Sequence, residues 1–297
     1  MAKLRLGTRG SALARRQSEI VAEALRSALP EVEIETIEVR TEGDRRQDLS
    51  LELMGGQGVF VKEIEQQLLD GKIDLAVHSL KDMPSDLPEG LTLGALLPRG
   101  DARDALVSRG GLILKALPAG ARIGSDSRRR AVQILAMRPD IEVVSIRGNV
   151  DTRLRKVDAG EYEAIALAVA GLDRLGLLAR ATQIFSPAEV LPAPGQGAIA
   201  VECRVDDTDT LALLLRIDDA TTRVVTGAER AFLRTMGAGC RLPVAAYATL
   251  EGDSLHLDAM IAEDNGAMHR ASVTGPQSEA ETIGRTMAQR LRIEARL

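Results

Sequence analysis

Several short segments of this 297-residue chain combine residue types that bind anions or transfer protons. In GTRGSALA, residues 7–14, Arg9 stands two residues before Ser11, where a helix is predicted to begin. The backbone N–H groups and the positive end of that helix would face an anion. Taken alone, Ser11 is more often an ordinary helix N-cap. The segment therefore predicts either a cap or an anion site.

The segment HSLKDMP, residues 78–84, places Lys81 beside Asp82 directly after a predicted buried strand. Lys81 has three interpretations: a Schiff-base nucleophile, a point charge for an acidic ligand, or a solvated surface residue. Ligands bind where parallel strands end, so the position favours a functional role for the pair.

Arginines gather in two further segments, GSDSRRR at residues 124–130 and SIRGNVDTRLRK at residues 145–156. Three cations in the first turn of a helix are unfavourable by roughly a few tenths to 1 kcal/mol each. A solvated basic face is one explanation for them. Arg147 and Arg153 repeat the arrangement after the next strand. A ligand with several carboxylates or phosphates explains both segments better, because guanidinium groups bind such anions with paired hydrogen bonds.

The two cysteines differ in their surroundings. Cys240 ends a GAGC segment and precedes Arg241, which is a setting for an exposed, partly ionised thiol. An inert buried thiol is the more frequent outcome for a lone cysteine. Cys203, in the strand-like segment IAVECRV, fits that outcome well.

Hydrophobic periodicity predicts the elements that would position these segments. Alternating strands and helices indicate a parallel α/β sheet in each of two units. The first predicted helix would bury Leu13, Gln17, Ile20, Ala24 and Ala28. The strands are expected at residues 3–7, 32–39, 73–78, 122–124, 142–146 and 164–169, and the helices at 11–29, 59–69, 128–137 and 150–157.

The later part of the chain has a different pattern. A segment rich in proline and glycine, LPAPGQGAIAVEC, indicates a hinge that returns to the first unit. Beyond it we expect helices packed on a small antiparallel sheet. The helices are expected near residues 208–216, 220–236 and from about 279, and the strands near 244–250, 254–261 and 268–273.

Composition excludes several classes of protein. The net charge of −5 and the aromatic content of 2% argue against a nucleic-acid-binding protein. The chain has no long apolar run, no apolar segment near its start, no CxxC or HExxH motif and only scattered histidines. We therefore expect a cytoplasmic protein without a metal site and without membrane or nucleic-acid partners.

The ordered set of segments resembles the porphobilinogen deaminases over residues 4–275. The motifs are GTRGSALA, HSLKDMP, GSDSRRR, RGNVDTRL, LAVAGLDRLG, LPAPGQG and GAGC. The resemblance implies an α/β fold of three domains, in which two lobes like those of type-two periplasmic binding proteins precede a small α+β domain. The implied domains are residues 1–98 with 197–216, residues 102–192 and residues 219–297.

The resemblance also implies a function. Members of this family are transferases of porphyrin and heme biosynthesis that deaminate four porphobilinogens and condense them head-to-tail into hydroxymethylbilane. The chain grows on a dipyrromethane cofactor, held by a thioether that would form at Cys240. We expect a monomer, because no additional interaction segment is visible.

Residue by residue, the resemblance implies a site built from the segments described above. Asp82, Lys81 and Arg9 match catalytic residues. Residues matching the cofactor site are Cys240, Ser79, Lys81, Asp82, Ser125, Ser127, Arg129, Arg130 and Gly171. Residues matching the substrate site are Arg9, Ser11, Phe60, Arg147, Asn149, Arg153 and Gln196.

Four positions depart from the family pattern. Leu53 and Gln57 stand where lysines are common, Asp126 where a serine is common, and Arg128 where an apolar residue is common. Three alternatives to an active deaminase stay open: a non-catalytic two-lobed protein that binds a small anion, a lysine-dependent carbonyl or pyridoxal enzyme using Lys81, and a family member with lowered activity.

Overall fold

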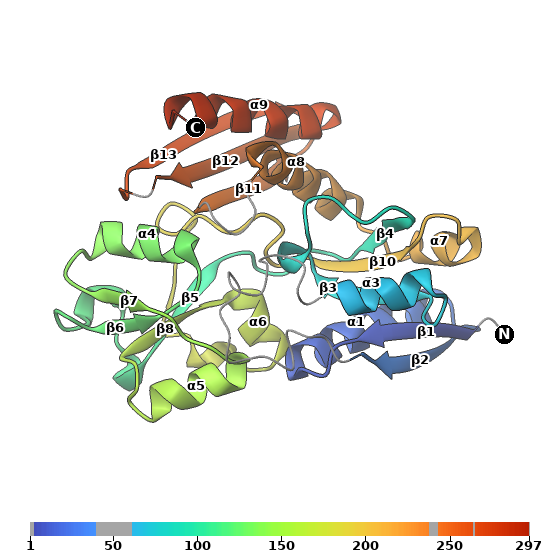
Figure 1. Cartoon of the computed structure of the whole chain (residues 1–297), viewed down its shortest axis with the longest axis horizontal. Coiled ribbons are helices and arrows are strands. Elements are labelled where there is room, and N and C mark those ends of the chain that lie inside the picture. The colour runs from blue at the N-terminus through green and yellow to red at the C-terminus, as the bar shows by residue number, and fades with distance from the viewer. Residues whose placement is uncertain (1–2, 40–60, 238–242, 264, 297) are drawn as a thin grey trace. The chain divides into compact units, whose positions relative to one another are not determined.

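The computed structural model describes residues 3–39, 61–237, 243–263 and 265–296 (Figure 1). The chain divides into two compact units. The first comprises Met1–Gly100 and Ala198–Arg223, and the second Asp101–Gly197 and Val224–Leu297. Within the described residues, no helix is both long and apolar enough to cross a membrane.

The first unit is built on a five-stranded mixed sheet with the order β2-β1-β3-β10-β4. Strand β1 runs parallel to β2 and β3, whereas β10 is antiparallel to β3 and β4. The expected parallel sheet is therefore only partly correct: β10 begins beside the end of β3 and runs back along it. The predicted return of the chain after the hinge is confirmed. The strands are β1 (Lys3–Thr8), β2 (Glu33–Glu38), β3 (Leu75–Ser79), β4 (Leu91–Leu96) and β10 (Ile199–Arg204).

Helices α1 (Ala12–Ala28), α3 (Lys62–Leu69) and α7 (Thr208–Leu214) belong to the first unit. The face predicted for α1 is only partly correct, because Gln17 is the one residue of that set that is buried. Val21 and Leu25 are buried instead, in a cluster with strand residues such as Leu6, while Ile20 and Ala24 lie at the edge of that cluster. Two neighbouring stripes of this helix are both apolar, so periodicity alone could not choose between them.

The second unit contains another five-stranded mixed sheet, with the order β7-β6-β8-β5-β9. Strands β6, β7 and β8 are parallel, and β5 is antiparallel to β8 and β9. The strands are β5 (Asp104–Ser108), β6 (Arg122–Gly124), β7 (Glu142–Val144), β8 (Ala164–Ala168) and β9 (Gln183–Ile184). The helices are α4 (Arg128–Met137), α5 (Val150–Asp158) and α6 (Val169–Arg174).

The last part of the chain forms the expected antiparallel sheet, in the order β11-β12-β13. Helix α9 packs on β12 and β13 (Figure 1). Phe232 of α8, Leu257 of β12 and Leu291 of α9 are all fully buried in one core. The elements are β11 (Val244–Glu251), β12 (Ser254–Ala262), β13 (Met268–Pro276), α8 (Ala220–Met236) and α9 (Ala280–Glu294).

Close packing of α9 on α8 gives a prediction for stability. A Cβ atom at Gly284 would lie 2.1 Å from the backbone oxygen of Ala228, which cannot move as a side chain can. We expect Gly284→Ala to lower the free energy of unfolding by about 2 kcal/mol or more. Gly227→Ala in α8 is the control, because nothing lies within 4 Å of its Cβ position. Equal thermal midpoints for the two variants would contradict the packing argument.

Candidate functional site

The predicted residues of the first unit lie at one edge of its sheet. Strands β1 and β3 are parallel neighbours, paired at Leu6 with Leu75, so both end at the same edge. Arg9 follows β1, and Asp82 follows β3 in the single helical turn η1 (Leu80–Asp82). This is the edge at which α/β sheets bind ligands.

Local hydrogen bonds fix the segments that follow these two strands. Ser11 caps helix α1, since its Oγ accepts a hydrogen bond from the Ala14 N–H at 3.2 Å. The cap interpretation of Ser11 is thereby confirmed, which leaves its predicted role toward substrate a prediction. Ser79 Oγ accepts a hydrogen bond from Nε2 of Gln17 at 2.8 Å.

The turn that carries Lys81 and Asp82 is anchored on both sides. Leu80 and Met83 are buried, and the Leu80 N–H donates to the Ala198 carbonyl at 3.1 Å. Asp82 itself is exposed, and Lys81 is partly exposed. The turn therefore presents the Asp82 carboxylate to solvent on a rigid support.

A buried acidic cluster lies in the first unit and was not predicted. His78 Nε2 is 3.1 Å from an Oε atom of Glu202, and both side chains are almost fully buried. Glu65 is also buried, and burial together with the charge of Glu202 raises its pKa to about 7. The signal was available in principle, because a glutamate within the apolar strand IAVEC needs a partner.

In the second unit the predicted residues again follow the ends of parallel strands. Ser127 caps helix α4, accepting from the Arg130 N–H at 3.3 Å, and Ser125 Oγ accepts from the Ser127 N–H at 3.2 Å. Asn149 precedes α5 but makes no capping hydrogen bond with its side chain. Gly171 is buried in α6, which follows β8.

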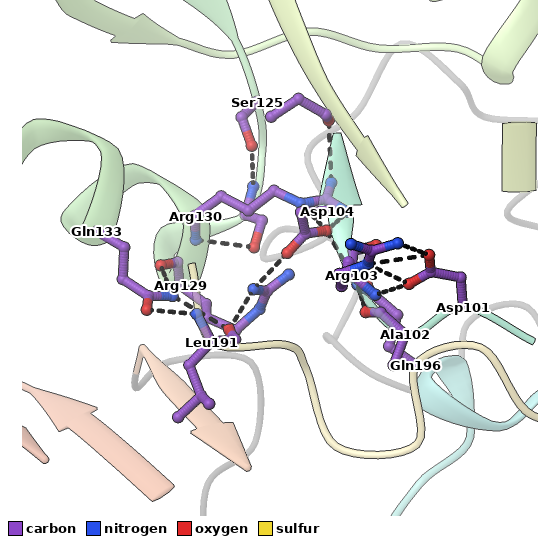
Figure 2. Close-up of polar contacts among 12 residues, drawn as sticks. Asp101, Ala102, Arg103, Asp104, Ser125, Arg129, Arg130, Gln133, Leu191 and Gln196 are labelled. Carbon is purple, nitrogen blue, oxygen red and sulfur yellow. Dashed lines mark hydrogen bonds and ion pairs between the residues drawn. The ribbon is translucent and has the colours of Figure 1, made fainter. Parts of the chain in front are cut away.

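Arg129 and Arg130 converge on one carboxylate, that of Asp104 at the start of β5 (Figure 2). Arg129 Nη1 donates to Asp104 Oδ2 at 2.7 Å. Arg130 donates to Oδ1 through Nε at 2.9 Å and Nη2 at 2.6 Å. The sequence favoured a polyanionic ligand over a solvated basic face as the reason for these arginines, and it predicted no internal partner for them. The structure gives two of the three an internal counter-ion, while the adjacent Arg128 is exposed.

The Asp104 cluster lies in the protein interior. The Asp104 side chain is 0% exposed, and the side chains of Arg129 and Arg130 are each less than 10% exposed. Burial would raise the pKa of Asp104, but the charges and hydrogen bonds of Arg129 and Arg130 outweigh it and hold the pKa below its ordinary value. Gln196 adds a hydrogen bond from Nε2 to Asp104 Oδ1 at 2.9 Å. The predicted hinge residue thus supports this ion pair.

Arg147 and Arg153 both lie beside one carboxylate, that of Asp126. Asp126 Oδ2 is 3.4 Å from Arg147 Nε and 3.8 Å from Arg153 Nη2. The two arginine side chains are 26% and 22% exposed. Guanidinium groups so placed can bind a carboxylate from a ligand.

Another unpredicted carboxylate connects the hinge segment to the small sheet. Glu229 of α8 is fully buried. Its two oxygens accept hydrogen bonds at 2.7 Å from the Gly195 and Ala248 backbone N–H groups. Glu229 therefore holds the segment that contains Gln196.

Of the two cysteines, Cys203 alone lies among the described residues. Cys203 is buried, and burial raises the pKa of its thiol to about 11, which agrees with an inert cysteine. Phe60, Cys240, Leu53 and Gln57 lie outside the described residues. Among the described residues, no group of three or more histidine, cysteine or acidic side chains is placed to hold a metal ion.

Comparison with known proteins gives a family for nearly the whole chain. The family described as porphobilinogen deaminase, dipyromethane cofactor binding domain, matches residues 4–212. The porphobilinogen deaminase C-terminal domain matches residues 224–292.

Curated relatives named porphobilinogen deaminase are similar over almost their full length. The protein from Brevibacillus brevis is 49% identical, covering 93% of this chain and 90% of the relative. The protein from Sorangium cellulosum is 47% identical, covering 98% of each. The protein from Xanthomonas axonopodis pv. citri is 49% identical, covering 98% of this chain and 96% of the relative.

Proposed function

Because this chain belongs to the porphobilinogen deaminase family, we propose that it deaminates four porphobilinogens and condenses them head-to-tail into hydroxymethylbilane. The observation that carries the proposal is the family match, which includes both the cofactor-binding domain and the C-terminal domain. A non-catalytic anion-binding protein would have no use for the second of these.

The donors at the edge of the second sheet support this assignment chemically. Each pyrrole carries an acetate and a propionate, so the cofactor and the growing product are polyanions. Arg147 and Arg153 already lie beside the carboxylate of Asp126, which indicates that carboxylates fit between these two groups. The donor set therefore fits a dipyrromethane. When bound, the dipyrromethane supplies the free pyrrole carbon from which the chain grows.

The proposed roles of the other residues follow from their charge and position. Asp82 accepts pyrrole N–H hydrogen bonds, stabilises developing positive charge and assists proton transfer. Lys81, Arg9 and Ser11 bind carboxylates at the edge of the first sheet. Donors proposed for the cofactor are Ser79, Lys81, Ser125, Ser127, Arg129 and Arg130, and Gly171 is proposed as a further cofactor contact. Phe60, Asn149, Arg153, Arg147 and Gln196 are proposed on the substrate side.

The internal contacts of Arg129 and Arg130 limit what these two can do. One carboxylate balances two guanidinium charges in the Asp104 cluster, so the cluster keeps one net positive charge. In a buried setting this charge attracts an anion without requiring either side chain to leave Asp104. We propose that both arginines act on the cofactor in this way.

The attachment of the dipyrromethane to Cys240 is testable by intact mass. We expect purified protein to exceed its sequence mass by two linked pyrrole units, and Cys240→Ser to lose that excess. Cys203→Ser is the control and should keep it, because the Cys203 thiol is buried. An unmodified wild-type mass that persists after incubation with porphobilinogen would contradict the proposed function and favour the anion-binding alternative.

The remaining alternatives have simple discriminators. Borohydride trapping of an adduct on Lys81 would support a lysine-dependent carbonyl enzyme. A turnover assay separates an active deaminase from a family member with lowered activity.

We propose further that the protein is a cytoplasmic monomer with three domains. Light scattering at a mass near 31.8 kDa would support the monomer. The separate core shared by α8, α9 and the small sheet supports treating residues 219–297 as a third domain. The other two would be residues 1–98 with 197–216 and residues 102–192, each holding one five-stranded sheet.

A further inference from the structure

The carboxylate of Asp126 occupies the space between the two arginines proposed to bind substrate. Its side chain is 17% exposed and lies 3.4 Å from Arg147 and 3.8 Å from Arg153. Oδ1 accepts a hydrogen bond from Ser145 Oγ at 2.5 Å. Oδ2 is buried and has no hydrogen-bond partner among the described residues. One oxygen is thus held by a serine, and the other faces two cations.

Because Oδ2 accepts no hydrogen bond, the ion pairs that Asp126 makes with Arg147 and Arg153 are weaker than hydrogen-bonded arginine–carboxylate pairs. Arginine binds carboxylates most strongly when two parallel N–H groups donate to the two oxygens. Neither Arg147 nor Arg153 makes that arrangement with Asp126, and Arg153 donates through Nε to the Gly148 carbonyl at 2.8 Å. A ligand carboxylate with better geometry can therefore replace Asp126 as the partner of these arginines.

We propose that Asp126 serves as an internal counter-ion for Arg147 and Arg153 and competes with substrate carboxylates for these two arginines. The proposal rests on the proposed function for the identity of the ligand. In the free protein, Asp126 offsets the repulsion between the two guanidinium groups. During turnover, it weakens binding of each acidic pyrrole and of the polyanionic product by the same competition.

The test removes the negative charge of Asp126 while keeping the shape of its side chain. We expect Asp126→Asn to lower the KM for porphobilinogen by about five-fold, which corresponds to roughly 1 kcal/mol for one partly buried ion pair. Asp126→Ser should change KM in the same direction. Asp140→Asn is the matched control, because Asp140 also pairs with an arginine, Arg138, but precedes strand β7, whereas Asp126 follows strand β6. The control should leave KM unchanged.

A binding measurement separates this proposal from the proposed function. Succinate, a simple dicarboxylate, should raise the thermal midpoint of Asp126→Asn at about five-fold lower concentration than that of wild type. Without succinate, the variant should melt below wild type, since two cations have lost their counter-ion. This comparison does not require turnover, so it holds even if no hydroxymethylbilane is made.

Three results would overturn the proposal. One is an unchanged or raised KM in both Asp126 variants. Another is equal succinate stabilisation of wild type and Asp126→Asn. The third is the same succinate response in Asp140→Asn as in Asp126→Asn, because it would assign the effect to net charge. If wild type lacks turnover but the succinate difference is found, the proposed function fails and the competition by Asp126 stands.

Discussion

Asp104→Asn is expected to lower the free energy of unfolding by about 3–5 kcal/mol, the usual cost of removing one partner from a buried ion pair. Asparagine matches aspartate in size, so no cavity forms. The loss arises because Arg129 and Arg130 keep their charges in the interior without a carboxylate between them. Their hydrogen bonds to the Leu191 and Ala166 carbonyls, at 2.6 and 3.1 Å, neutralise neither charge.

The neighbouring pair of Asp101 and Arg103 provides a matched control for Asp104 (Figure 2). These side chains are 29% and 44% exposed and make the same kind of contact, at 2.6 Å. We expect Asp101→Asn to cost about 1 kcal/mol or less, because solvent screens an exposed pair. Thermal midpoints measured in the same buffer compare the two variants. Similar midpoints for both would show that burial adds nothing to the Asp104 cluster.

The pH dependence of the Asp104 contribution follows from its depressed pKa. The stabilisation is fully present above the unfolded-state pKa of about 3.8 and is lost as the pH falls through the lower folded-state pKa. The difference between wild type and Asp104→Asn should therefore be constant near neutral pH and narrow only in acid. A difference that changes between pH 6 and 8 would have to arise from another group.

Much of the fold could be predicted because each element carries its own signal. Part of the antiparallel sheet alternates between apolar and polar residues, as in SLHLD at the start of β12, and Ser11 marks the start of α1 with a cap. The direction of β10 had no such signal. The direction of β10 depends on its pairing with β3, which lies more than a hundred residues earlier in the chain. A buried strand has the same hydrophobic residues whether it runs parallel or antiparallel to its neighbour, so its sequence does not reveal its direction.

For the candidate site, too, the sequence predicted individual residues but not the distant residues that contact them. Residues such as Asp82 and Arg147 were found because they follow predicted strands, and the structure places them at strand ends. Their partners were not found. Asp104 is 25 residues from Arg129, and Asp126 was noted only as a departure from the family pattern. Ion pairs between distant segments depend on the tertiary fold, which single-sequence periodicity does not contain.

Asp82→Asn is expected to reduce turnover by about 10³-fold or more while leaving the fold intact. The expected loss combines the typical effects of removing a proton-transfer group and a charge-stabilising group. Stability should change little, because Asp82 is exposed and the buried residues Leu80 and Met83 hold the turn. Asp86→Asn is the control, since Asp86 is also exposed and lies four residues later.

The Asp82 experiment needs two measurements besides the rate. The thermal midpoint shows whether the variant is folded, and the intact mass shows whether the dipyrromethane is present. A folded, fully loaded variant that lacks turnover would assign Asp82 to the reaction itself. A folded variant without the added mass would assign it to cofactor assembly, because the same carboxylate would then be needed to join the first two pyrroles. Turnover like that of wild type would remove Asp82 from the mechanism, since no other described carboxylate was predicted to take its role.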